Sequence, residues 1–343
     1  MSLGFNFISR FVVVASFVVL AGCSSERTVH AFQGAMMGTT YTVTLVEGGE
    51  PNFQDERVLD EAESLSVQAL ARVDKALSTY KDDSDLMRFN QSAVGSIYEM
   101  GDEMAEVTLL SLEMRDASQG FFDPSVGALV SAWGFGAFSQ DVPPNSEEIK
   151  ALMAQSGMRF VRLIDDTRIQ KLGEGFIDYS AIAKGYAVDK VAETLHSLGF
   201  KNFMVEVGGE VRVSGHNAEG NHWRLGIEQP DILRRKAYNI VHISDVSMAT
   251  SGDYRNFIDG PDGRYSHTIN PKTGYPVSSQ IASVSVIMKD CASADAWATA
   301  LLAMGKKKAL YIAQEQDLAA FFIFREKDGF SSRATIKMLS YIH

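Results

Sequence analysis

The sequence predicts a protein between the α/β and α+β classes, in which mixed sheets are packed by helices. Two patterns support this class: amphipathic segments with the 3.6-residue period of helices, and short apolar runs bounded by glycine, typical of strands. No internal repeat, low-complexity linker or heptad pattern interrupts them. The chain has 343 residues, of which 45% are hydrophobic, enough for one large domain or two modest ones. A single domain over residues 31–343 is the simplest interpretation.

The first 22 residues differ in kind from the rest of the chain. Arg10 precedes the apolar run FVVVASFVVLAG, which is shorter than an ordinary membrane span. Residues 20–23 are similar to the lipobox of bacterial lipoproteins, in which the cysteine becomes the lipidated first residue. We therefore expect a lipoprotein signal peptide over residues 1–22 and a lipidated tether over residues 23–30 that begins at Cys23. An ordinary anchor helix or a plain signal peptide is the alternative.

The first half of the mature chain predicts one strand and three helices. Alternating apolar residues indicate a strand over residues 41–47. Amphipathic helices are expected over residues 55–77 and 103–118. A capping box of Asn145 and Glu148 predicts a third helix that ends at Gly157.

The second half is richer in short strands. A helix is expected over residues 181–198, a hairpin over residues 202–215 around Gly208 and Gly209, and a further helix from Ala292. The other expected strands cover residues 159–164, 168–172, 175–178, 222–228, 237–244, 281–288, 318–324 and 334–338.

The charge argues against a nucleic-acid-binding protein, and the cysteine content argues against a disulfide-stabilised fold. The formal net charge of -11 and the absence of a dense basic run argue against a nucleic-acid partner. An anionic ligand would then need a metal ion or a focused basic pocket. The chain has 2 cysteines, and lipidation of Cys23 leaves Cys291 alone, which excludes a disulfide framework. We expect Cys291 to be a buried apolar residue beside a helix start.

Asp295 and Thr299 form the most informative pair of polar residues. Because positions i and i+4 share one face of a helix, these two side chains can offer oxygens to one hard cation such as Mg²⁺. The alternative is that Asp295 favours the positive end of the helix dipole and Thr299 packs through its methyl group.

The run IDYSAIAKG adds a second candidate segment. Asp178 precedes a helix, and Lys184 lies in its first turn, where the dipole and the ammonium both favour an anion. The alternative is that Asp178 or Ser180 caps the helix and that Lys184 is simply solvated.

Two further segments contain polar residues in turn-forming sequence. In MATSGDYRNF, a Ser/Gly-rich turn followed by Arg255 indicates a phosphate cradle, although turn propensity alone also explains it. In YSHTINPKTGYP, His267 lies in a loop, where a histidine is either a base or a surface residue. The runs GAMMGTTY and GFFDPSVG are weaker, since such residues often serve cores and turns.

Taken together and in order, these segments resemble the ApbE family, the FAD:protein FMN transferases of bacterial lipoprotein type. The resemblance covers nearly the whole mature chain and rests on MGTTY, STYKDDSDLMRFN, FFDPSVG, DYSAIAKG, VEVGGEVRVSG, TSGDYRNF, HTINPKTGYP and ADAWATA. It implies a Mg²⁺-dependent enzyme that cleaves FAD at its pyrophosphate. FMN would pass to a threonine hydroxyl of a membrane-associated redox protein, with release of AMP.

The resemblance also implies roles for individual residues. Mg²⁺ would be bound by the main-chain carbonyl of Ala181 and the side chains of Asp295 and Thr299. His267 is a candidate for the base that takes the proton of the threonine hydroxyl. Asn270 departs from the family, in which many members have aspartate at this position. The residues implied to meet the flavin and its phosphates are Met37, Tyr80, Phe121, Phe122, Asp123, Asp178, Lys184, Arg255 and Ile269.

The same resemblance places the protein in the cell envelope, lipid-anchored to a membrane on its periplasmic face. Its implied partners are FAD and subunits of membrane electron-transfer complexes that carry the acceptor threonine. Two other functions remain open from the sequence. One is a Mg²⁺-dependent FAD pyrophosphatase that yields FMN and AMP, and the other is a non-catalytic flavin-binding lipoprotein.

Overall fold

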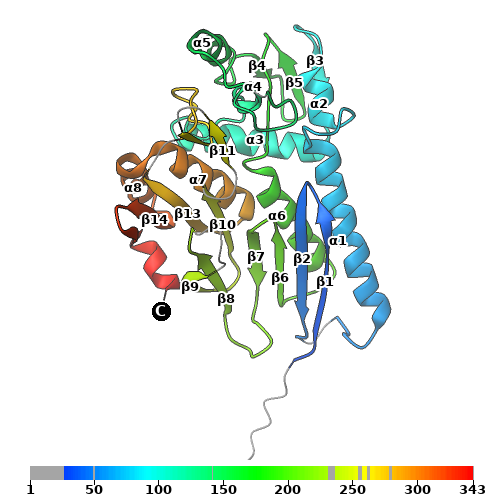
Figure 1. Ribbon diagram of the computed structural model, residues 1–343. Coiled ribbons are helices and arrows are strands. Elements are labelled where there is room, and N and C mark those ends of the chain that lie inside the picture. The colour runs from blue at the N-terminus through cyan, green and yellow to red at the C-terminus, as the bar shows by residue number, and fades with distance from the viewer. Residues whose placement is uncertain are drawn as a thin grey trace, which may run out of the picture.

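The computed structural model describes residues 27–48, 51–140, 142–230, 236–253, 257–260, 263–277 and 280–342. The predicted signal peptide, Cys23 and Arg255 lie outside these residues. The centre of the molecule is an eight-stranded sheet with the strand order β1-β2-β6-β7-β10-β13-β14-β15, and every neighbouring pair is antiparallel (Figure 1). Its strands are β1 Val29–Met36, β2 Thr39–Val46, β6 Phe203–Val207, β7 Glu210–Ser214, β10 Ser247–Gly252, β13 Ile281–Met288, β14 Ala319–Glu326 and β15 Gly329–Ala334.

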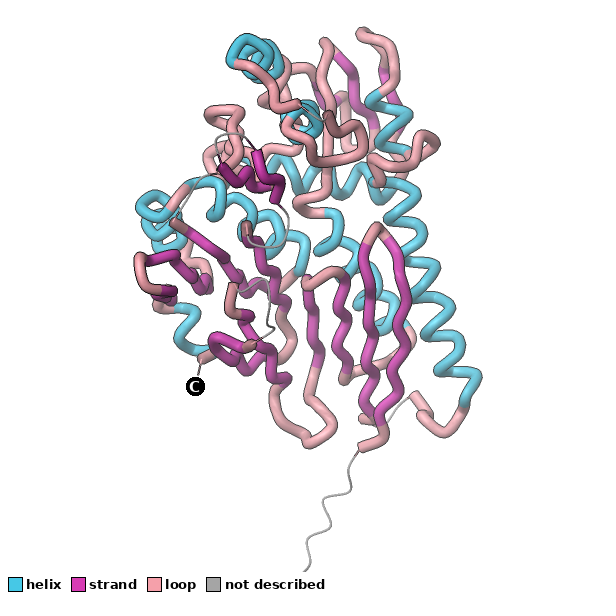
Figure 2. The backbone as a smooth tube through the Cα atoms, in the orientation of Figure 1, coloured by secondary structure: helices cyan, strands magenta, loops and turns pink. Residues whose placement is uncertain are grey.

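Helices cover one face of this sheet (Figure 2). Helix α6 (Ala183–Ser197) packs on β6 and β7, whereas α7 (Cys291–Met304) packs on β10 and β13. The long helix α1 (Glu56–Leu77) packs against α6. Alternate apolar side chains of the strands and the inner faces of the helices share one large core. Two more helices, α3 Asp102–Ala117 and α8 Lys306–Glu315, contact α7.

The opposite face of the sheet carries a second core. It is covered by the hairpin of β8 (Trp223–Glu228) and β9 (Ala237–Ile243) and by the 3-10 helix η1 (Lys337–Tyr341). Trp223 and Met338 are both buried there. The part of the sheet around β13 and β14 is therefore covered on both faces, which fits the apolar runs of these two strands.

Short elements lie above one end of the sheet in Figure 1. A third core of Leu129, Trp133, Ile149 and Ile269 joins the helices α4 and α5 to the segment after β12. The elements of this region are α2 Asp85–Asn90, β3 Ile97–Glu99, α4 Gly127–Ala132, α5 Ser146–Ala154, β4 Val161–Leu163, β5 Arg168–Lys171, β11 Phe257–Gly260 and β12 Gly263–Ser266.

Most predicted elements are confirmed, and the predicted class is confirmed with antiparallel pairing at the α+β end of its range. The capping box of Asn145 and Glu148 is formed at the start of α5. Cys291 is free and buried at the start of α7, as expected. Among the described residues, no helix combines the length and the apolar composition needed to cross a bilayer.

Three sequence predictions are wrong in detail. Residues 175–178 form only an isolated bridge, between Phe176 and Val126, because a loop rather than a strand lies beside them. Residues 334–338 are not a strand, since β15 ends at Ala334 and Met338 turns into the second core. The start of the segment MATSGDYRNF, predicted to be a Ser/Gly-rich turn before Arg255, instead belongs to strand β10, because it pairs with β13.

Asp189 fixes the relative position of α6 and α7. Its carboxylate accepts backbone N–H bonds from Cys291, at 2.9 and 2.8 Å, and from Ala292, at 2.9 Å, so a residue of α6 satisfies the first amides of α7. Arg212 of β7 donates to the same carboxylate at 2.5 Å. At the same crossing, a Cβ on Gly185 would lie 2.3 Å from the carbonyl oxygen of Cys291. The two helices therefore touch through their backbones.

We expect Asp189→Ala to lower the free energy of unfolding by about 3–5 kcal/mol, because it leaves Arg212 and the first amides of α7 without their partner. Chemical denaturation measures this change. Asp116→Ala, which removes the exposed partner of Arg115, is the control and should change stability by roughly 0.5 kcal/mol or less. Equal effects of the two substitutions would contradict the role given to Asp189.

Candidate active site

The candidate active site lies where two hairpin turns of the sheet meet the start of α6 and the first half of α7. The turn between β1 and β2 contains Met37 and Gly38, which have positive φ angles of 55° and 71°. The turn between β6 and β7 contains Gly208, and a Cβ there would lie 3.0 Å from Thr39 and 3.2 Å from Cδ of Lys184. The second turn needs glycine because no side chain fits between the first turn and the lysine.

A cluster of two buried carboxylates and one partly exposed lysine forms the centre of this site. The ammonium of Lys184 lies 2.8 Å from Oε1 of Glu210 and 3.8 Å from Oδ2 of Asp295. Both carboxylate residues are only 3% exposed. Lys184 is therefore not a simply solvated side chain, which rules out that alternative from the sequence.

Burial and mutual charge shift the pKa values in this cluster. Burial raises the pKa of Glu210 to about 7; the Lys184 charge opposes this shift and the Asp295 charge adds to it. Burial also raises the pKa of Asp295, against the opposing effect of Lys184. Burial disfavours the charged form of Lys184, but its two carboxylate neighbours outweigh that effect and raise its pKa. The carboxyl groups of Glu210 and Asp295 thus interact with the Lys184 ammonium where solvation is poor.

The start of α6 leaves the Ala181 carbonyl available. Ala181 lies two residues before the first residue of α6, so its carbonyl is outside the hydrogen bonds of the helix. Gly185 is the third residue of α6, and its amide, which has no acceptor within the helix, donates to Oδ2 of Asp295 at 3.2 Å. Within the described part of the chain, no donor is found for the Ala181 carbonyl oxygen. The crossing of α6 and α7 therefore places the buried carboxylate of Asp295 at the first turn of α6.

Thr299 lies one turn after Asp295 on α7 and contacts the sheet through its hydroxyl. Its Oγ1 and the Oγ of Ser251 on β10 are 3.0 Å apart. Ser251 thus holds the hydroxyl on the polar side of the helix, which argues against packing of Thr299 through its methyl group alone. Arg255, four residues after Ser251, lies outside the described residues.

The donor set fits a hard divalent cation. A carboxylate, a hydroxyl and a main-chain carbonyl are the oxygen ligands that Mg²⁺ takes in proteins. Oε2 of Glu210 is buried and has no hydrogen-bond partner among the described residues. Since two buried carboxylates face one ammonium, an additional positive charge would be electrostatically favourable in this cluster.

A second group of predicted residues lies around the loop before α4. The Asp178 amide donates to the Pro124 carbonyl at 2.8 Å, which joins the FFDPSVG and IDYSAIAKG segments. The Asp178 carboxylate accepts from the amide and hydroxyl of Ser180, at 2.8 and 2.5 Å, and so forms a local turn rather than the N-cap of α6. Partial desolvation and the nearby Asp178 charge raise the pKa of Tyr80, whose side chain is otherwise exposed.

Three residues implied to meet the flavin have side chains that pack or bond within the protein itself. Phe122 is buried in the main core, and Ile269 is buried in the third core. Asp123 accepts from the amide and hydroxyl of Ser125, at 2.9 and 2.5 Å, and pairs with Arg115 at 3.5 Å. Contacts of Phe122 and Ile269 with a ligand would therefore have to come from their backbone atoms.

Phe121 and His267 lie at the margin of this region. The ammonium groups of Lys272 and Lys308 lie 5.6 and 4.7 Å from the centre of the Phe121 ring. The His267 ring lies 6.3 Å from the Phe135 ring in an edge-on arrangement. Asn270 donates to the carbonyl of Ala303 at 3.2 Å, so its amide connects this loop to the end of α7.

Sequence reasoning missed Glu210. The sequence contained a clue to it, because Glu210 is a charged residue directly after the Gly208–Gly209 pair, at a strand position where an apolar residue is expected. The pattern of alternating apolar residues in VEVGGEVRVSG made the whole segment look like a structural hairpin. Neither Asp189 nor Ser251 had a recognisable signal, since each acts on a residue far away in the chain.

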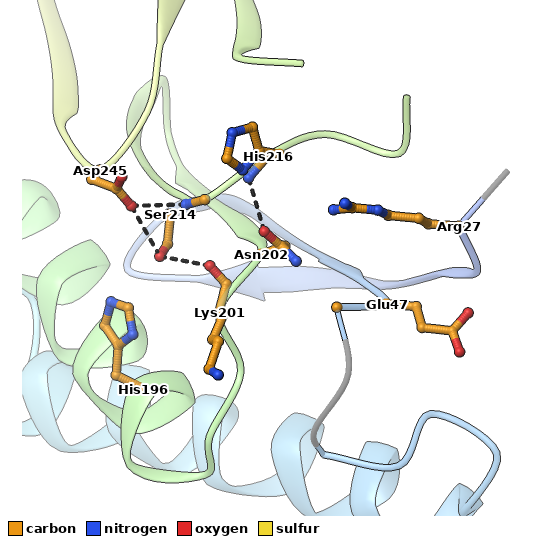
Figure 3. Close-up of a pocket in the computed structure, with 10 residues that line it drawn as sticks. Arg27, Glu47, His196, Lys201, Asn202, Ser214, His216 and Asp245 are labelled. Carbon is orange, nitrogen blue, oxygen red and sulfur yellow. Dashed lines mark hydrogen bonds between the residues drawn. The ribbon is translucent and has the colours of Figure 1, made fainter. Parts of the chain in front are cut away.

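A separate cavity of 840 Å³ lies at the other ends of β6 and β7 (Figure 3). Figure 3 shows Asn202 accepting from the His216 amide, and Asp245 beside Ser214. None of the predicted site residues lines this cavity. Asn202, Ser214 and Asp245 already form hydrogen bonds within the protein, and the cluster around Lys184 remains the candidate active site.

Comparisons with known proteins match almost the full chain. The ApbE family model matches residues 37–322. The FAD:protein FMN transferase of Vibrio cholerae serotype O1 is 36% identical over 326 residues, covering 94% of this chain and 96% of the relative. The flavin transferase ApbE from Vibrio cholerae has a similar structure, with a TM-score of 0.82, 34% identity and coverage of 92% of this chain and 100% of that one.

The apo form of the flavinyl transferase ApbE from Pseudomonas stutzeri gives the same result. Its TM-score is 0.82 at 36% identity, covering 92% of this chain and 97% of the other. The matched residues include both hairpin turns and the two helices that build the Lys184 cluster. The chain belongs to the ApbE family.

Proposed function

We propose that the protein is a Mg²⁺-dependent FAD:protein FMN transferase that moves FMN from FAD to a threonine hydroxyl and releases AMP. Its relatives in Vibrio cholerae and Haemophilus influenzae carry the name FAD:protein FMN transferase, at 36% and 35% identity. The observation that carries the proposal is the cluster at the start of α6, in which the Lys184 ammonium contacts two buried carboxylates. It combines a cation for a diphosphate with oxygen ligands for a metal.

Different residues of the chain would bind the metal, the diphosphate and the flavin. Ala181, Asp295 and Thr299 would hold Mg²⁺, which neutralises charge on the phosphoryl oxygens when bound. Lys184 would bind the diphosphate, and Arg255 is proposed to assist it. Met37, in the β1–β2 turn, and the aromatic Tyr80 and Phe121 would contact the flavin.

The transfer itself forms one phosphorus–oxygen bond and breaks another. The threonine oxygen attacks the phosphorus on the FMN side of the pyrophosphate, and AMP leaves with the bridging oxygen. His267 is proposed to accept the hydroxyl proton, because an unactivated hydroxyl is a poor nucleophile. Water in place of the threonine would give FMN and AMP, which is the pyrophosphatase alternative.

We further propose that the protein is lipidated at Cys23 and held at the periplasmic face of a cell envelope membrane. The lipobox-like residues 20–23 support this proposal. The acceptors would be subunits of membrane electron-transfer complexes. An anchored transferase would meet such acceptors without first diffusing to the membrane.

The decisive experiment is intact-mass analysis of a purified acceptor domain after incubation with the protein, FAD and Mg²⁺. A mass gain of one FMN on a threonine that is lost in chelator is expected. Accumulation of AMP and free FMN without a gain would instead favour the pyrophosphatase. Retention of intact FAD by the protein at saturating Mg²⁺ would favour the non-catalytic flavin-binding lipoprotein.

We expect Asp295→Ala to reduce Mg²⁺-dependent transfer by about a hundredfold or more, because it removes the buried carboxylate of the metal site. The rate of FMN incorporation, measured against Mg²⁺ concentration, tests this expectation. Circular dichroism should show that the variant remains folded. A normal rate in Asp295→Ala would remove the metal assignment.

We expect His267→Ala to bind FAD as the unaltered protein does and to transfer FMN about 10²–10⁴-fold more slowly, because only proton removal is affected. Fluorescence titration with FAD measures the binding, and single-turnover analysis measures the transfer. An unchanged transfer rate would show that His267 is only a loop residue.

A further inference from the structure

The two carboxylate oxygens of Glu210 differ in their contacts with the described residues. Oε1 binds the Lys184 ammonium at 2.8 Å. Oε2 is buried and has no hydrogen-bond partner within the described ranges. A buried acceptor without a partner destabilises a protein, and more so when it is charged. Such a cost is usually retained only where a ligand or a water later binds.

The position of Glu210 is fixed by the hairpin that carries it. It is the first residue of β7 and pairs directly with Val207 of β6 across Gly208 and Gly209. Side chains of paired residues share one face of a sheet, and neighbours in sequence alternate. Glu206 therefore lies on the opposite face of the same hairpin, where its Oε1 accepts from the Gly209 amide at 2.6 Å.

The cluster has two carboxylates and one ammonium, so the carboxylate charge is not fully balanced. Glu210 and Asp295 are both buried, and Lys184 is the cation that contacts each of them. Coulomb interactions are strong in such poorly solvated space. A divalent cation on Asp295 would supply positive charge there, and its bound waters would supply hydrogen-bond donors.

We propose that Glu210 is a positioning residue for the metal and diphosphate site. Its Oε1 holds Lys184 beside Asp295, and its Oε2 accepts a hydrogen bond from a water on the bound Mg²⁺. This inference rests on the proposed function, because it requires that Asp295 binds the metal. Outer-shell carboxylates of this kind orient the direct ligands and raise metal affinity.

The test is calorimetric titration of the full chain with Mg²⁺, without FAD. Glu210→Gln keeps the size of the side chain and removes its charge. We expect it to weaken Mg²⁺ binding about 10- to 100-fold. Thermal unfolding should show the same loss as a smaller rise in melting temperature on addition of Mg²⁺, with little change in chelator. A merely structural glutamate would instead lower the melting temperature in chelator and leave Mg²⁺ affinity unchanged.

Glu206→Gln is the matched control, because it makes the same chemical change on the other face of the hairpin, and it should leave Mg²⁺ affinity unaltered. If Glu210→Gln does not fold, Glu210→Asp, which withdraws the carboxylate by one methylene, replaces it. An unaltered Mg²⁺ affinity in whichever Glu210 variant folds overturns the inference.

Asp295→Ala separates this inference from the proposed function. If Asp295→Ala abolishes Mg²⁺ binding and the Glu210 variant leaves it intact, only the role of Glu210 is wrong. If the unaltered protein does not bind Mg²⁺, the proposed metal-dependent function fails together with the inference.

Discussion

The backbone contact between α6 and α7 is the constraint on which the candidate site depends. Gly185 has no side chain, so α6 can approach the carbonyl of Cys291, and Asp189 one turn later binds the first amides of α7. Because of this contact, Asp295 reaches and binds the Gly185 amide, which has no acceptor within the helix. One close crossing thus fixes the buried carboxylate at the start of α6.

The electrostatics of the site contrast with those of the whole protein. The chain has a formal net charge of -11, which repels an anionic cofactor at long range. Lys184 acts against this charge from a position between two buried carboxylates, where solvent screening is weak. Its flanking turns rely on residues with positive φ angles, at Met37 and Gly208. A methionine in that conformation is uncommon, and such conformations are concentrated at functional sites.

Sequence reasoning identified the residue types of the site better than their contacts. Asp295 and Thr299 follow from helical spacing, and the structure adds that Ser251 orients the hydroxyl. Phe122 and Ile269 were grouped with the flavin residues, yet their side chains lie in cores. The reason is that a motif marks a stretch of chain, whereas the direction of each side chain depends on the elements packed against it.

The strong local features can be predicted from the residues alone: the helices with apolar faces, the Gly208–Gly209 hairpin, the capping box of α5 and the order of the motifs. These depend on neighbours within a few residues, so they can be read locally. The absence of a strand over residues 175–178 and the contact between Glu210 and Lys184 emerge only in the folded chain. Those outcomes depend on contacts between distant segments, which local periodicity does not encode.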